Sequence, residues 1–194
     1  MGHRSPQRSA LRPGLPRLLL WTALWVFLLD QITKWLVVHV MDLATRLQID
    51  LLPPVVTLRM AWNSGVNFGL LSGFDLRWLL VVLALVIAAA VVVWIWREGG
   101  GRRVQVSGGL LVGGALGNVV DRVLYGAVAD FVNFPLFGEA LGWLVRTLSF
   151  GRLSFEAQYS FNVADIAIFL GAVGLVLFAG GTGAARPRRP ARRG

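Results

Sequence analysis

The chain has 194 residues, of which 56% are hydrophobic and 15% are charged, and its formal net charge is +9. Soluble domains are typically about 45–50% apolar and about 25% charged, so this composition excludes most soluble enzymes and disordered proteins. There is no cysteine and there are only two histidines, so we expect no disulfide, no thiol catalysis and no metal site. We also expect no cofactor.

The first candidate membrane span is 18–41, an apolar stretch that contains Asp30 and Lys34. Four arginines precede it, so it could instead be a secretory signal peptide. However, the segment 29–34, with the sequence LDQITK, stands where a cleavage site made of small residues is needed. We therefore interpret 18–41 as a span that is retained.

The next two elements are a strand and a second span. Residues 55–62 are rich in β-branched side chains, which predicts a β-strand, and Asn63-Ser64-Gly65 predicts a turn after it. Trp78 to Trp96 is a run of 19 residues without a polar side chain. As a helix it would be about 28 Å long, which matches the hydrocarbon core of a bilayer.

Two further spans are predicted at 108–128 and 161–179, and both contain ionisable residues that we expect to face the interior of a helix bundle. In the loop between them, 141–146 is predicted to form a short interfacial helix. The third span also carries small residues at four-residue spacing, which lets another helix pack closely. These residues are Gly109, Gly113 and Gly117.

The arginines predict the orientation of this four-span chain. Twelve basic residues lie before the first span, between the second and third, and after the fourth, and the positive-inside rule places these segments in the cytoplasm. Loops 42–77 and 129–160 would then lie outside. We expect a basic N-terminus (1–17), a transmembrane domain (18–180) and a basic tail (181–194), both ends being cytoplasmic. This distribution explains most of the positive charge without a nucleic-acid partner.

Ionisable residues within spans are costly and mark candidate functional positions. Asp30 and Lys34 are four residues apart on one helix, so they can form an ion pair, which indicates a structural role. A second polar group shares one face of the third span, where a neighbouring acid and base can neutralise each other. It consists of Asn118, Asp121, Arg122 and Tyr125.

Asp130 and Asp165 are predicted to lie at similar depth near the outer membrane surface, because one follows the outer end of the third span and the other begins the fourth. Asp121 would lie about 13 Å deeper than Asp130 if the helix continued between them. Two neighbouring carboxyl groups do not easily both ionise, so the pair can act as acid and base on a water molecule, as in aspartic proteases. Alternatively, each carboxylate could cap a helix or pair with an arginine of a loop.

Five motifs occur in order along the chain: DQITK at 30–34, NSGVNFG at 63–69, GALGNVVDR at 114–122, VADF at 128–131 and FNVAD at 161–165. Together they resemble the motifs of bacterial lipoprotein signal peptidase, also called signal peptidase II. One motif alone would be weak, but five in order on four predicted spans make a specific match over about 30–180.

The resemblance implies an all-α inner-membrane aspartic endopeptidase with four transmembrane helices and a small extracytoplasmic β-cradle in the first outer loop. Such enzymes remove the signal peptide of a prolipoprotein just before a cysteine that carries diacylglycerol. The resemblance places the catalytic pair at Asp130 and Asp165, near the periplasmic face. It implies partners limited to this lipid-modified substrate and membrane lipids, and we expect a monomer. The resemblance further implies substrate binding or support of the pair by Asn63, Gly65, Asn118, Arg122 and Asn162, and structural polar roles for Asp30, Lys34 and Asp121.

Two features depart from the family pattern. Asn67 stands where many members have alanine, which adds a polar group near the site. The stretch from Asp130 to Asp165 is also longer than is usual, and we expect the excess within 136–158. This affects the conformation of the loop rather than the pair of aspartates.

Two other functions remain open on the residues alone. Intramembrane acids also mark proton-coupled carriers, although four spans without an internal repeat are few for a carrier, and both acids lie near one face of the membrane. A non-catalytic assembly factor could use the glycine-lined face as its interface, but this leaves the paired aspartates unexplained. Cleavage of a lipid-modified peptide by the purified protein, without an ion gradient, would separate these alternatives.

Overall fold

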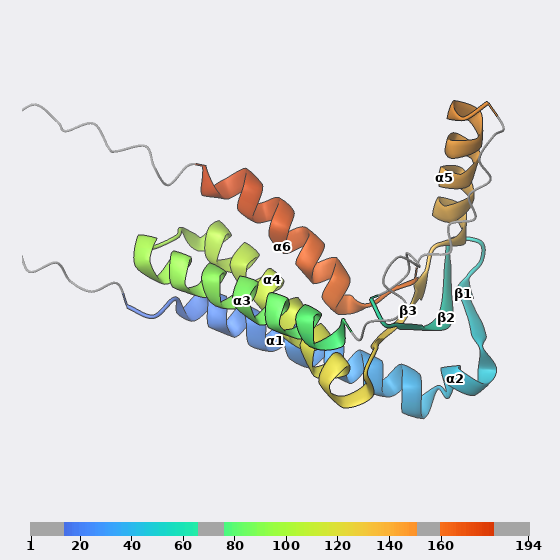
Figure 1. Cartoon of the computed structure of the whole chain (residues 1–194), viewed down its shortest axis with the longest axis horizontal. Helices are drawn as coiled ribbons and strands as arrows, with labels where there is room; N and C mark the ends of the chain where they lie inside the picture. The colour runs from blue at the N-terminus through green and yellow to red at the C-terminus, as the bar shows by residue number, and fades with distance from the viewer. Residues whose placement is uncertain (1–13, 66–75, 151–159, 181–194) are drawn as a thin grey trace, which may run out of the picture.

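Four long helices run along a common direction and form the larger part of the molecule (Figure 1). They are α1 (Arg17–Trp35), α3 (Arg77–Glu98), α4 (Arg102–Tyr125) and α6 (Val163–Ala179). A four-stranded sheet lies at one end of this bundle, away from the start of α1 and the end of α6. The fold is seen in a computed structural model, which describes residues 14–65, 76–150 and 160–180.

Helix α4 is the centre of the bundle and packs against α1, α3 and α6. Glycines allow the close approach: a Cβ atom on Gly109 or Gly113 would lie 2.7 Å from the carbonyl oxygen of Leu19 or 2.5 Å from that of Ala23. On another side of α4, a Cβ on Gly114 would lie 2.5 Å from a backbone oxygen of α6. The glycine-lined face predicted for close helix packing is therefore confirmed, and its partner is α1.

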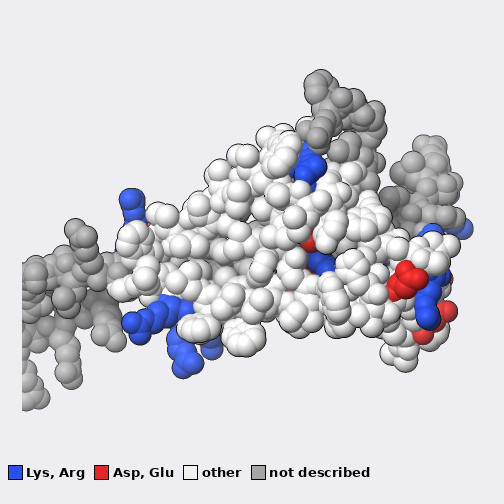
Figure 2. Space-filling view, turned by 90° about the horizontal axis from the view of Figure 1, so that it is seen from below, with Lys and Arg blue, Asp and Glu red and all other residues white. Residues whose placement is uncertain are grey.

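Two helical segments are long and apolar enough to cross a membrane by themselves. They are Arg17–Val40, which ends in a π-helical turn over Leu36–Val40, and Arg77–Glu98. Helix α4 has 24 residues but carries charged side chains, and α6 has 17 residues. Figure 2 shows uncharged side chains over most of the bundle, with Lys and Arg at one end and charges of both signs at the end that bears the sheet.

The sheet is antiparallel with strand order β1-β2-β3-β4. β1 (Gln48–Leu52) and β2 (Val56–Asn63) precede α3, whereas β3 (Val128–Asn133) and β4 (Ser160–Phe161) lie between α4 and α6. The strand predicted at 55–62 is confirmed as β2. The expectation of a β-cradle within the first outer loop is wrong in part, because half of the strands come from the second loop.

The expected third span, 108–128, extends too far. Helix α4 ends at Tyr125, because Gly126 has φ +80°, a left-handed conformation that terminates helices. The chain then enters β3, so Asp130 lies on a strand rather than at a helix end. The apolar residues after Gly126 suit a buried strand as well as a helix.

A hydrophobic cluster holds the sheet against the end of α1. Val37 from the π-helical turn packs with Leu43 of the short helix α2 (Leu43–Arg46), with Leu58 of β2 and with Phe131 of β3. All four side chains are buried. Because Phe131 follows Asp130, this cluster fixes the position of the strand segment that carries the acid.

The interfacial helix predicted at 141–146 is part of a longer helix, α5 (Pro135–Leu148), which begins with a proline in its first turn. In Figure 1 it runs across the direction of the four long helices, at the end that bears the sheet. It makes no extensive contact with any other helix or strand that the structure describes. Asn67 and the part of the long loop from 151 to 158 lie outside the described residues.

Candidate active site

Asp130 is buried in the middle of the sheet, where β3 pairs with β2 and Asp130 lies opposite Ala61. Both of its carboxyl oxygens accept hydrogen bonds from amide side chains. Asn162 Nδ2 donates to Oδ1 at 2.7 Å, and Asn63 Nδ2 donates to Oδ2 at 3.0 Å. The two donors come from opposite ends of the chain, so the position of this carboxyl group depends on the complete fold.

The turn after β2 orients Asn63. The backbone N–H of Gly65 donates to Asn63 Oδ1 at 2.8 Å, which forms an Asx turn. This leaves the amide nitrogen of Asn63 to face Asp130. Gly65 itself has φ +80°, where glycine is favoured, and a Cβ there would collide with Leu80. The predicted turn therefore orients the side chain of Asn63 toward Asp130.

Asp165 is held at the N-terminus of α6 by a capping box. Asp165 N donates to Asn162 Oδ1 at 2.8 Å, and Asn162 N donates to Asp165 Oδ2 at 3.2 Å. The second oxygen, Oδ1, accepts from Asn118 Nδ2 at 2.9 Å. The spacing of the FNVAD motif explains this geometry, because a capping box needs its two polar residues three positions apart.

Asn162 connects the two acids. Its side chain is fully buried, and its Nδ2 lies 2.7 Å from Asp130 Oδ1 and 3.2 Å from Asn118 Oδ1, while its Oδ1 and backbone N–H bind Asp165. Asn118 continues the path to Asp165. Asp130 and Asp165, which the sequence predicts at similar depth in the membrane, are thus linked through two asparagines in one buried network.

The surroundings of Asp130 favour its protonated form. Burial, followed by the negative charge of Asp165, raises the pKa of Asp130 to about 6, although hydrogen bonds from Asn63 and Asn162 and the charge of Lys34 act in the opposite direction. An acid with such a pKa can hold or release a proton near neutral pH. Within the described part of the chain, no cluster of three or more His, Cys, Asp or Glu side chains could hold a metal ion.

A buried lysine contacts several polar residues next to the two acids. Lys34 Nζ lies 2.7 Å from Asp30 Oδ2 and 2.8 Å from Asp121 Oδ2, and it donates to Asn118 Oδ1 at 3.2 Å. Asp30 Oδ1 accepts from the backbone N–H of Ala164 at 2.9 Å. The ion pair predicted on α1 is therefore confirmed. It also belongs to a polar network, larger than expected, that joins α1, α4 and α6.

The expected depth difference between Asp121 and Asp130 is wrong. It assumes a continuous helix, whereas α4 ends at Tyr125 and the chain turns back beside it. The backbone N–H of Ala129, the neighbour of Asp130, donates to Asp121 Oδ2 at 3.2 Å. Asp121 thus supports the strand that carries Asp130.

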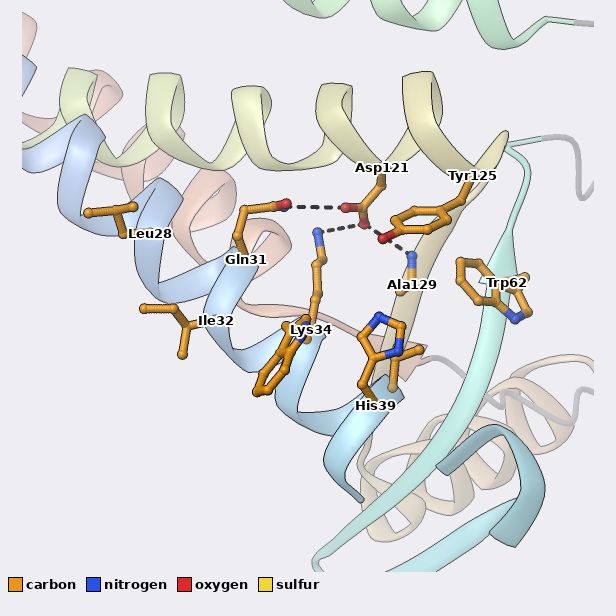
Figure 3. Close-up of a pocket in the computed structure, with 11 residues that line it drawn as sticks. Leu28, Gln31, Ile32, Lys34, His39, Trp62, Asp121, Tyr125 and Ala129 are labelled. Carbon is orange, nitrogen blue, oxygen red and sulfur yellow. Dashed lines mark hydrogen bonds and ion pairs between the residues drawn. The ribbon is translucent and has the colours of Figure 1, made fainter. Parts of the chain in front are cut away.

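Gln31 is a further member of this network that its motif alone does not single out. Its Nε2 lies 3.2 Å from Asp30 Oδ2 and 3.3 Å from Asp121 Oδ1. Gln31 and Asp121 line a pocket of about 350 Å³. Figure 3 shows their side chains next to each other, with Trp62 and Tyr125 at the end of the pocket toward β2. The sequence feature that could have identified Gln31 is its position directly after Asp30 in an apolar span.

Arg122 and Tyr125, predicted on the same polar face as Asn118, have different surroundings. Arg122 is half-buried, its Nη1 donates to the carbonyl oxygen of Asn118 at 3.4 Å, and its positive charge acts on both Asp130 and Asp165. Its buried Nε has no hydrogen-bond partner among the described residues. Tyr125 is exposed, its ring stacks obliquely on that of Trp62, and it lines the same pocket as Asp121.

The chain is similar to a group of bacterial membrane proteins. The model of the family Signal peptidase (SPase) II matches residues 22–179. The lipoprotein signal peptidase of Methylobacterium sp. (strain 4-46) is 42% identical over 158 residues, which are 80% of this chain and 84% of that protein. That of Methylorubrum extorquens (strain PA1) is 40% identical over 171 residues, or 87% and 86%. A bacterial membrane enzyme solved by the in meso method superposes with a TM-score of 0.64 at 25% identity, over 82% of this chain and 90% of that one.

Proposed function

Because the chain belongs to the signal peptidase II family, we propose that it cleaves prolipoproteins by an aspartic mechanism that uses Asp130 and Asp165. Family membership makes it a bacterial integral membrane peptidase that removes signal peptides from lipoproteins. The finer proposal is that the cut precedes a diacylglyceryl-modified cysteine and that two carboxyl groups activate the water. The observation that supports it is the buried network of asparagines that joins Asp130 to Asp165.

In the proposed reaction the two acids share one proton, held chiefly by Asp130. Ionised Asp165 removes a proton from the water, whose oxygen attacks the scissile carbonyl carbon, while Asp130 protonates the carbonyl oxygen. When the tetrahedral intermediate collapses, the C–N bond breaks, the amine of the cysteine leaves with a proton from Asp165, and a hydroxyl of the intermediate returns its proton to Asp130. The raised pKa of Asp130, about 6, supports its role as the acid.

The remaining site residues position these groups. Asn63, aimed by Gly65, and Asn162 hold the Asp130 carboxyl group, and Asn118 holds that of Asp165. We assign Arg122 to a carbonyl group of the substrate backbone, because its buried Nε has no partner among the described residues. The reaction as proposed uses no cofactor and no metal.

The proposed placement has all four long helices across the inner membrane, with the site near the periplasmic face and the chain acting as a monomer. Arg97, Arg102 and Arg103 lie at the end of the bundle away from the sheet, which supports a cytoplasmic position for that end and for both termini. The acyl chains of a lipid-modified cysteine would then stay in the bilayer while its peptide bond reaches the acids.

The test is cleavage by the purified protein in detergent. The substrate is a synthetic peptide with the signal-peptide sequence of a prolipoprotein and a diacylglyceryl cysteine. In the absence of an ion gradient it should be cut once, before the cysteine, as shown by mass spectrometry. The same peptide without the lipid serves as the control and should be cut far more slowly. A protein that needs a proton gradient, or that binds the peptide without cutting it, would contradict the proposal.

A further inference from the structure

Helix α5 leaves an apolar face uncovered, interrupted by Thr147, whose hydroxyl donates to the carbonyl oxygen of Trp143 at 2.9 Å. Placed at 100° per residue, its large exposed apolar side chains fall within about 140° of arc, and both charged residues, Glu139 and Arg146, fall outside that arc. The face consists of Leu136, Phe137, Trp143, Leu144 and Leu148, which are 52%, 58%, 68%, 43% and 71% exposed. Isolated exposed apolar residues are ordinary, but five on one side of a single helix mark an interaction surface.

The rest of the described protein does not cover this face. Gly138 is buried and Gly142 and Val145 are half-buried, and these three lie on the opposite side of the helix from the exposed apolar residues. No other described helix or strand makes extensive contact with α5. The apolar face is therefore directed away from the part of the protein that the structure describes.

We infer that α5 lies in the interfacial layer of the outer leaflet with this face in lipid, an inference that rests on the membrane placement proposed above. The helix runs across the direction of the long helices, which is the direction of the membrane plane if they span it (Figure 1). Leucine and aromatic residues opposite charged ones are typical of helices that lie in the interface. One acidic and one basic residue leave the helix without net charge, so the binding does not need anionic lipid.

This face of α5 has the same apolar character as the side of the bundle that would face lipid. Phe169 and Leu177 of α6 are also large apolar residues that are mostly exposed. Only Phe134 separates α5 from β3, and the backbone N–H of Leu136 donates to the carbonyl oxygen of Pro54 at 3.4 Å. A helix seated in lipid at this point sets the height of β3, and of Asp130 on it, above the membrane core.

The absence of cysteine from the sequence allows a direct test with single-cysteine variants carrying a fluorescent label. Leu144→Cys and Leu148→Cys report on the apolar face, Glu139→Cys and Arg146→Cys on the other side, and Phe169→Cys on the bundle. In phosphatidylcholine nanodiscs, lipids with a shallow doxyl group should quench labels at 144 and 148 several-fold more than aqueous iodide does. The order should reverse at 139 and 146.

Two results would overturn the inference. Equal quenching by iodide at all four positions of α5, with the label at Phe169 still shielded, would place the helix in water while leaving the membrane placement intact. Shielding that occurs only in nanodiscs with two copies of the protein would assign the face to a second copy. Exposure of the Phe169 label to iodide would instead show that the proposed membrane placement itself is wrong.

Discussion

Asparagine is the residue type that organises this site. Asn63, Asn118 and Asn162 each donate to a carboxyl group through the amide nitrogen and accept through the amide oxygen. A carboxylate side chain could accept but not donate, and it would add charge next to two acids. The amide therefore holds both acids in place without adding charge.

The two aspartates can be separated from their support by substitution. Asp130→Asn and Asp165→Asn keep the shape of the side chain but remove the shared proton, so cleavage per folded molecule should fall by about 10²-fold or more. Asp121→Asn weakens the contact with Lys34 and should mainly lower the yield of folded protein. Activity is measured on a lipid-modified peptide and normalised to protein recovered from the membrane.

The contrast between these variants decides the assignment. If Asp121→Asn abolishes the specific activity while Asp130→Asn retains it, the catalytic pair is assigned to the wrong residues. If Asp130→Asn and Asp165→Asn both cleave at the normal rate, the chemistry does not use this pair.

A second prediction at this scale concerns pH. The pKa of Asp130 is raised to about 6, and the hydrogen bond from Asn63 lowers it, so Asn63→Ala should raise it further. The shared proton is lost as pH rises, which means that the alkaline limb of kcat/KM should begin near pH 6 or above and move to higher pH in Asn63→Ala. Gln48→Ala, which alters an exposed contact with Asp50, is the control and should leave the limb unchanged. A limb that stays in place or moves to lower pH would contradict the role of Asn63.

At the scale of elements, the four long helices, part of α5 and β2 could be predicted from hydropathy and composition, whereas α2 and β3 could not. The run from Ala127 to Val132 is short and apolar apart from Asp130, so it suits a buried strand or the last turns of a span. Gly126 is the local signal for the helix end. The pairing of β3 with β2 joins segments far apart in sequence, and no local pattern encodes it.

The packing of α4 on α1 gives a prediction of stability. A Cβ on Gly113 would lie 2.5 Å from the carbonyl oxygen of Ala23, so Gly113→Val must push the helices apart. We expect a loss of about 1–3 kcal/mol in the free energy of unfolding, as in other overpacked sites. Gly180→Val, at a position with open space around it, is the control and should change the stability far less. Equal unfolding midpoints in detergent for the two variants would show that α4 and α1 pack less closely.

Helix α5 gives a prediction of activity. Replacing Leu144 and Leu148 with aspartate puts two charges on the face assigned to lipid, which should release the helix from the interface. Because α5 follows β3, cleavage of a substrate in nanodiscs should fall several-fold, whereas cleavage of a detergent-solubilised substrate should change little. The matched control replaces Glu139 with glutamine. Equal losses in both media would argue for a structural role of α5 within the protein.

For the molecule as a whole, length and hydropathy identify two of the four long helices as spans, because α6 has only 17 residues and α4 contains polar residues. Helix α4 carries Asp121 and Arg122 and many glycines, which lower its apolar score. The structure surrounds it with α1, α3 and α6, so its polar side chains meet partners rather than lipid. The motifs predict the site residues, but only the fold shows that Lys34 and Gln31 connect α1 to α4 and that Asp30 connects α1 to α6.

The proposed topology is testable with reporter fusions. Alkaline phosphatase joined after Ser149 should be active, because this position is expected outside, and green fluorescent protein joined after Gly100 should fluoresce in the cytoplasm. Exchanging the two reporters controls for expression. Reporters that place both positions on the same side of the membrane would rule out four spans with this orientation.

The contact between Ala164 and Asp30 has a consequence for biosynthesis. The first helix to leave the ribosome carries an acid whose partner is a backbone group of the last helix, and both Asp165 and Asn162 also belong to the final part of the chain. A nascent chain that ends before α6 has one acid of the pair, and its Asp30 lacks the hydrogen bond from the backbone N–H of Ala164. If Asp130 and Asp165 are the catalytic pair, as proposed, activity requires α6 in the bundle, and a product that lacks α6 should have no proteolytic activity.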